Sequence, residues 1–134
     1  MLFLGKKPKP VPPVSPATTT ARGQAGEDQA LAYLQARGLR LLGRNYRTPG
    51  RGGGEIDLIL QESDGTVVFV EVRSRSYQDF GGAGASIVYA KRQRIVRAAR
   101  QWLHAKGWQV PCRFDVVLIQ GAQLQWLQAA FDAA

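Results

Sequence analysis

Two carboxylates interrupt the most apolar part of the chain, and their spacing is suited to catalysis. Asp57 lies within EIDLIL and Glu71 lies within VVFVEV, where the other residues are typical of buried strands. Because side chains alternate between the two faces of a strand, Glu71 shares its face with Arg73. If the two strands pair across the turn sequence SDG, Asp57 and Glu71 converge on one face of the sheet.

A third carboxylate belongs to a predicted helix nearer the N-terminus. The run from Gln24 to Arg37 has helical spacing, and Gly38 follows at the position where a helix would end. In helical projection Glu27 falls in the middle of the apolar stripe. A carboxylate on the buried face of a helix is costly unless a positive group meets it. Glu27 could therefore complete an acidic cluster with the two strand carboxylates.

Three carboxylates held together repel one another and need a cation. Mg²⁺ or Mn²⁺ accepts carboxylate, carbonyl and water oxygens, and could polarise a phosphodiester and activate a water. Alternatively, each acid pairs with Arg or Lys in a half-buried salt bridge, which is the better interpretation for any single acid. Three acids on faces that should meet favour a metal site with Asp57 and Glu71 as ligands. The spacing Asp-x13-Glu-x-Arg is by itself a weak signal.

The remaining elements must position these residues. A proline-rich leader is expected over residues 1–20, followed by a single domain over residues 21–134. Strands are predicted at 39–47, twice within 54–75 and at 112–120, and a second helix at 89–106. Glycine-rich loops are expected at 48–54 and 77–86, and a short strand with a terminal turn or helix at 123–131. This order, α-β-β-β-α-β-β, predicts an α/β (α+β mixed) fold with a mixed sheet flanked by helices.

The charge balance favours a polyanionic partner. The 134 residues include 18 Lys and Arg against 10 Asp and Glu, a formal net charge of +8. Nucleic acid fits this balance before an anionic membrane does, and a solvated basic surface is the alternative. The same choice applies to the candidate phosphate contacts, which are Arg75, Lys91, Arg94 and Arg97.

Other sequence features bound the class of protein. No apolar run approaches the roughly 20 residues that span a bilayer, and the N-terminus does not have the order of a secretory signal. The single cysteine, Cys112, excludes an intramolecular disulfide. A cytoplasmic protein fits best. Asp115, within CRFDVV, is interpreted as a buried salt-bridge acid.

Several longer stretches resemble a known family. They are GEDQALAYLQARGLRLLGRNYR, GEIDLI, VVFVEVRSR, KRQRIVRAARQWL, CRFDVV and the closing AAF. In this order they resemble the YraN family of small bacterial proteins (uncharacterised protein family 0102). That family is placed in the restriction-endonuclease-like fold, near the archaeal Holliday-junction resolvases. The resemblance implies a PD-(D/E)xK-type nuclease site with Glu27 as the helix acid, Asp57 and Glu71 as metal ligands, and Arg73 at the catalytic-lysine position.

Arg73 departs from the family pattern. A lysine there can orient or help deprotonate the attacking water, whereas a guanidinium keeps its proton and can only hold the phosphate. Lys91, on the sheet-facing side of the second helix, could reach the site and supply an ammonium.

Two functions therefore stand side by side. One is a Mg²⁺-dependent nuclease acting on DNA, including branched or damaged DNA. The other is a non-catalytic nucleic-acid-binding protein that retains the nuclease fold. The resolvase relatives suggest a homodimer, since symmetrical cutting of two strands calls for two sites.

Overall fold

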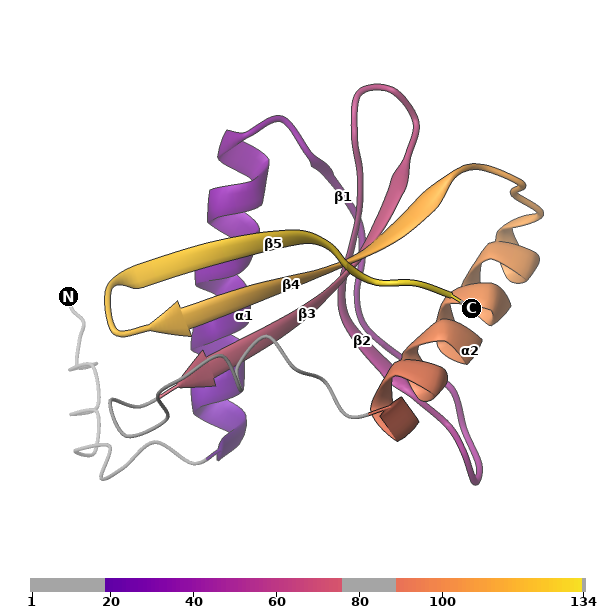
Figure 1. The fold of residues 1–134 in the computed structure, drawn as a ribbon, viewed down its shortest axis with the longest axis horizontal. Coiled ribbons are helices and arrows are strands. Elements are labelled where there is room, and N and C mark those ends of the chain that lie inside the picture. Colours follow the sequence, from indigo (N-terminus) through magenta and orange to yellow (C-terminus); the bar gives the residue numbers. More distant parts are fainter. Residues whose placement is uncertain (1–18, 76–88, 134) are drawn as a thin grey trace, which may run out of the picture.

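The fold is a five-stranded mixed sheet with one helix on each face. The computed structural model describes residues 19–75 and 89–133, and the expected leader and the expected loop at 77–86 lie largely or wholly outside this range. The sheet has the order β1-β2-β3-β4-β5, in which only β3 and β4 are parallel (Figure 1). The predicted order of elements is confirmed. The elements are α1 (Thr19–Ala36), β1 (Arg40–Arg47), β2 (Glu55–Gln61), β3 (Val67–Arg75), α2 (Tyr89–Lys106), β4 (Cys112–Gln120) and β5 (Gln123–Phe131).

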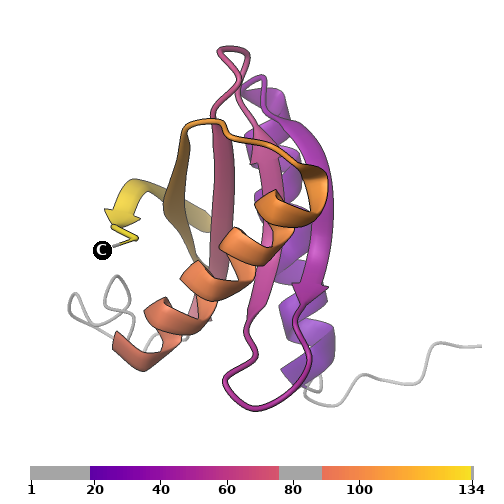
Figure 2. The same cartoon turned by 90° about the vertical axis from the view of Figure 1, so that its right-hand side faces the viewer.

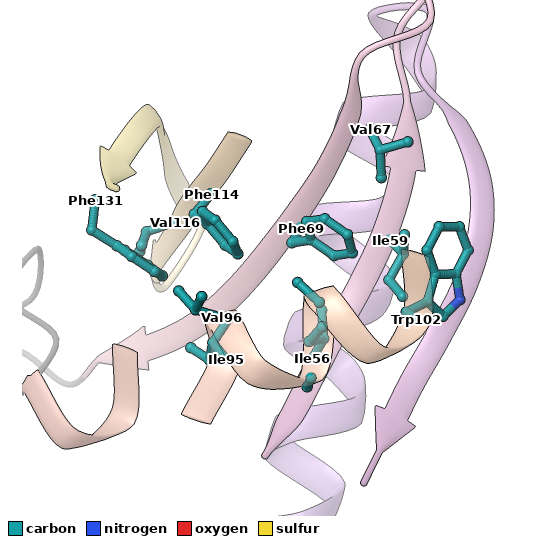
Figure 3. Packing of buried hydrophobic residues seen from close by; sticks show 12 residues of the cluster. Ile56, Ile59, Val67, Phe69, Ile95, Val96, Trp102, Phe114, Val116 and Phe131 are labelled. Atoms are coloured by element: carbon teal, nitrogen blue, oxygen red, sulfur yellow. The ribbon is translucent and has the colours of Figure 1, made fainter. Parts of the chain in front are cut away.

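The two helices cover opposite faces of the sheet, as Figure 2 shows with α2 in front of the strands and α1 behind them. Ala30 and Leu34 of α1 are fully buried against a cluster that includes Leu58 of β2. The cluster under α2 is aromatic at its centre, and Figure 3 shows Phe69 and Trp102 in it. This division explains why the strands in the middle of the sheet are apolar on both faces.

Both helices end at glycines with left-handed backbone. Gly38 has φ +94° at the end of α1, and Gly107 has φ +70° at the end of α2. The amide of Leu39 donates to the carbonyl of Leu34, and the amide of Trp108 donates to that of Leu103, which satisfies carbonyls in the last turn of each helix. The prediction that Gly38 ends the first helix is confirmed. That helix begins at Thr19, five residues before the expected Gln24.

The sheet divides between β2 and β3. These two strands pair only from Gln61–Val67 to Leu58–Val70. Beyond that point β2 continues beside β1, and β3 continues beside β4. Figure 1 shows β1 and β2 running apart from β3, β4 and β5, with α2 lying beside the β2 side of the division. We call this division the fork.

The expectation of a short last strand with a terminal turn or helix is wrong. β5 runs as one strand from Gln123 to Phe131 and pairs with β4 along its length, with an irregularity between Phe114 and Val116. Ala129 has φ +52° there. The strand can continue past this irregularity because the Phe131 ring stacks on Phe114, with the ring centroids 5.1 Å apart.

Asp115 holds the irregularity in place. Its carboxylate is fully buried and accepts hydrogen bonds from the Ala129 amide, 2.9 Å, and from Trp126 Nε1, 2.9 Å. Arg113 Nε lies 3.1 Å from both carboxylate oxygens, and its Nη1 pairs with Glu62. The interpretation of Asp115 as a buried salt-bridge acid is confirmed, and its partners on two strands give it a structural role.

The glycine-rich hairpin over residues 48–54 is held by hydrogen bonds. The amide of Thr48 donates to the carbonyl of Gly54, 3.0 Å, and the amide of Gly54 donates to Thr48 Oγ1, 2.8 Å. Gly54 also packs directly against α2, since a Cβ there would lie 2.3 Å from the carbonyl oxygen of Arg94.

Neither helix of the described residues combines the length and the apolar character that a membrane span needs.

The contact between Gly54 and α2 predicts a large effect of one methyl group. Gly54→Ala should lower the free energy of unfolding by about 1–3 kcal/mol, because the helix backbone must move away from β2. Gly43→Ala is the matched control, since a Cβ there would have its nearest neighbour at an ordinary 3.7 Å. Urea unfolding of the two variants measures the difference. Equal stabilities would show that α2 does not press on the hairpin.

Candidate functional site

A cavity of about 670 Å³ lies at the fork, between the two strand pairs and the first half of α2. Its volume is in the range of small-molecule and active sites. Acids and bases both line its wall, and so do residues of the Gly-rich hairpin. The charged residues that line it are Arg47, Glu55, Asp57, Glu71, Lys91 and Arg94.

Asp57 stands where the fork opens. In the sequence it lies directly before Leu58, the last position at which β2 pairs with β3. Its Oδ2 accepts a hydrogen bond from the Val72 amide at 2.8 Å. The side chain thus replaces the backbone partner that Val72 would have in a continuous ladder. The Asp57 side chain also lines the cavity. The fold therefore fixes the orientation of Asp57 through the backbone of the neighbouring strand.

The environment of Asp57 favours its neutral form. Burial raises the pKa of Asp57 to about 8, and the Glu71 carboxylate is the second cause of this rise. The hydrogen bond from Val72 acts in the opposite direction, while Glu27 and Glu55 add to the rise. Asp57 therefore carries a proton at neutral pH unless a cation joins it.

Glu71 is buried and has an ammonium partner. Its side chain is 7% exposed, and its Oε2 lies 2.5 Å from Lys91 Nζ on α2. The Lys91 side chain is 49% exposed and reaches across the cavity. The expectation that Lys91 reaches the site is confirmed. A lysine from a helix thus lies beside Glu71, although β3 carries arginine two residues further on.

A second ion pair lies at the mouth of the cavity. Arg47 Nε is 3.5 Å from Glu55 Oε2, and both side chains are well exposed. Sequence reasoning did not single out these two residues as site residues. The glycine-rich hairpin could have indicated this pair, because a tight connection places the last residue of β1 opposite the first residue of β2. These residues are Arg47 and Glu55.

Glu27 lies on the other face of the sheet, on α1. It is 8% exposed, and Arg44 Nε lies 3.6 Å from its Oε1. With its amide nitrogen toward Glu27, Asn45 lies 3.1 and 3.2 Å from the two carboxylate oxygens. Glu27 does not line the cavity formed by the described residues, although its charge reaches Asp57. Within residues 19–75 and 89–133, no three His, Cys, Asp or Glu side chains form a group that could hold a metal ion.

The predicted basic residues have different positions. Arg94 lines the cavity, and Arg97, one turn later, is exposed with its guanidinium 3.5 Å from where a Cβ of Gly52 would lie. Arg73 is half-buried on β3 opposite Leu118 of β4, and is not among the described residues that line the cavity. The side chain of Arg75 lies outside the described part of the chain.

The raised pKa of Asp57 predicts a pH-dependent stability. Between an unfolded pKa near 3.9 and the folded value of about 8, the folded state binds more protons than the unfolded state. The stabilising contribution is therefore complete below about pH 4 and is lost as the pH rises through about 8, by up to about 1.4 kcal/mol per pH unit. Asp57→Asn, which cannot ionise but keeps an acceptor for Val72, should not show this loss.

Urea unfolding of the metal-free wild type and of metal-free Asp57→Asn, between about pH 6 and pH 9, measures this loss of stability. Parallel curves for the wild type and Asp57→Asn would contradict the assigned environment of Asp57.

Comparison with known proteins places the chain among bacterial relatives. Residues 26–119 match the family model described as Uncharacterised protein family UPF0102. A UPF0102 protein of Paracidovorax citrulli is 69% identical over 116 residues, which are 87% of this chain and 86% of that protein. A UPF0102 protein of Acidovorax sp. is 63% identical over the full length of both chains. One of Verminephrobacter eiseniae is 58% identical over 98% of this chain and 96% of its own. The matched segment contains Glu27, the three carboxylates of the cavity and Lys91, and the chain belongs to uncharacterised protein family UPF0102.

Proposed function

We propose that this protein is a divalent-metal-dependent nuclease that hydrolyses phosphodiester bonds of DNA. The observation that supports it is the meeting of Asp57 and Glu71 at the fork, in a cavity whose wall also carries Lys91 and Arg94. Buried carboxylates next to exposed cations are suited to a substrate that brings its own negative charge. The element order and the placement of both acids on adjacent strands agree with the restriction-endonuclease-like fold that the sequence resemblance implies.

The carboxylate pair fits a hard divalent cation. Mg²⁺ is held by one or two carboxylates together with waters and substrate phosphates, so it does not need a third protein acid. Asp57 and Glu71 supply these carboxylates, since both line the cavity, and burial followed by the Glu71 charge raises the pKa of Asp57. Bound Mg²⁺ or Mn²⁺ would supply Lewis-acid polarisation of the phosphodiester.

The other residues of the cavity have roles toward the substrate. Lys91 places an ammonium next to Glu71, where the nuclease pattern calls for a lysine. Arg94 and Arg47 also line the cavity and would bind phosphates next to the reacting one. Arg73 lies two residues after Glu71 on β3, and its guanidinium would supply a positive charge but no proton acceptor. The catalytic role of Glu27 stays a prediction. Glu27 contacts Arg44 and Asn45 of β1, so it would act by positioning that strand.

A non-catalytic DNA-binding protein is the second candidate. Arg73 at the lysine position favours it, because a guanidinium cannot take a proton from water. This candidate predicts DNA binding that weakens steeply with salt, without metal-dependent cleavage.

Cleavage assays separate the two candidates. Purified protein with linear, nicked and branched DNA should release shorter products in Mg²⁺ or Mn²⁺ and none in a chelator. Asp57→Asn and Glu71→Gln should each lower the rate by about 100-fold or more, because each removes a charge that holds the cation. Asp132→Asn, an exposed aspartate near the C-terminus, is the matched control and should cleave like the wild type.

Two results would contradict the nuclease. Cleavage that persists in both carboxylate variants would come from a contaminant. Salt-sensitive binding of every DNA form without any metal-dependent product would support the non-catalytic protein instead.

A further inference from the structure

Two of the cations that line the cavity pair with carboxylates of the same cavity, and one of these carboxylates, Glu71, is a proposed metal ligand. Lys91 Nζ lies 2.5 Å from Glu71 Oε2, and Arg47 Nε lies 3.5 Å from Glu55 Oε2. We propose that these internal ion pairs make the binding of a divalent cation depend on the simultaneous binding of a polymeric phosphodiester, with Lys91 moving from Glu71 to a phosphate. The inference rests on the proposed function and adds a control of when the site takes its metal.

The contact between Lys91 and Glu71 is the stronger of the two pairs. Glu71 is 7% exposed, so water does little to screen its charge, and the ammonium is its close partner. A dication placed on the same carboxylate would meet this ammonium at short range and be repelled. The divalent cation therefore binds tightly only when the Lys91 ammonium has another anionic partner.

Lys91 is able to leave. Its side chain is 49% exposed and carries its ammonium on a flexible stem, and it belongs to the first turn of α2. Arg94, one turn later, lines the same wall, and no ion pair joins it to another residue of the described segments. A phosphate bound between these two side chains gives the ammonium a partner outside the cavity.

The formal charges of the cavity indicate the same dependence. Three acids, Glu55, Asp57 and Glu71, face three bases, Arg47, Lys91 and Arg94. A divalent cation alone adds an excess of two positive formal charges to these six residues in a partly buried space. A cation with two neighbouring phosphodiesters restores the balance. Each ligand therefore strengthens the binding of the other, and by linkage the two effects are equal.

Mn²⁺ binding tests this coupling without reference to turnover. Calorimetric titration of Mn²⁺ into the wild-type protein should give an affinity at least about tenfold higher when a phosphorothioate-linked DNA duplex is present, after correction for the duplex alone. Lys91→Gln should bind Mn²⁺ at least about tenfold more tightly than the wild type in the absence of DNA, with a smaller gain from the duplex. Lys106→Gln, at the far end of the same helix, is the matched control and should behave as the wild type.

Three results would overturn the inference. The first is equal Mn²⁺ affinity of the wild type with and without the duplex, a comparison that needs no variant and decides the matter even if Lys91→Gln does not fold. The second is a folded Lys91→Gln that binds Mn²⁺ alone no better than the wild type. The third is an equal gain from inorganic phosphate, which would exclude dependence on a polymer.

The test also separates this inference from the nuclease function. Coupled binding without cleavage of unmodified DNA would refute only the nuclease, and cleavage with uncoupled binding would refute only the coupling.

Discussion

The site depends on one hydrogen bond. The Val72 amide donates it to the Asp57 carboxylate at the point where β2 and β3 separate. In an unbroken sheet this amide would face a backbone carbonyl, and there would be no room beside it. Because a side chain satisfies it here, β2 can follow β1 while β3 follows β4. The cavity is the space that this division leaves, and the tight packing of Gly54 against the α2 backbone keeps the helix at its edge. The acid at position 57 thus supports the division of the sheet and also lines the cavity beside it.

The fork brings two buried acids close together, and this proximity makes the ionisation of Asp57 less favourable. Asp57 is held neutral by burial and by Glu71, and Glu71 is held by an ammonium from α2. Such an arrangement is costly in a partly buried space, and proteins retain strained electrostatics mainly where function uses them. The contrast with Asp115 is instructive. That acid is buried more deeply, yet Arg113, Trp126 and the Ala129 amide satisfy it fully, so it stabilises the β4–β5 pair and offers nothing to a ligand.

Local patterns predicted the elements and the convergence of Asp57 and Glu71 on one face of the sheet, and long-range packing explains what they missed. The bounds of α2 and β4 and the position of Gly38 follow from periodicity and from a turn-forming glycine, which depend on neighbouring residues only. Helical projection likewise placed Lys91 toward the sheet. The same projection placed Glu27 on a buried face, but it could not say that α1 covers the opposite face of the sheet from α2, where Arg44 and Asn45 receive this acid. Arg47 and Glu55 were missed because their pairing depends on the register of the hairpin.

A crystal structure of the protein grown with Mn²⁺ and a phosphorothioate-linked DNA duplex tests the central claim most directly. The anomalous signal of manganese locates the ion without reference to activity. We expect one manganese peak between the carboxylates of Asp57 and Glu71, with Lys91 turned from Glu71 toward a phosphate of the duplex. A duplex bound elsewhere, or a cavity without a manganese peak and with the Lys91–Glu71 pair intact, would contradict the account.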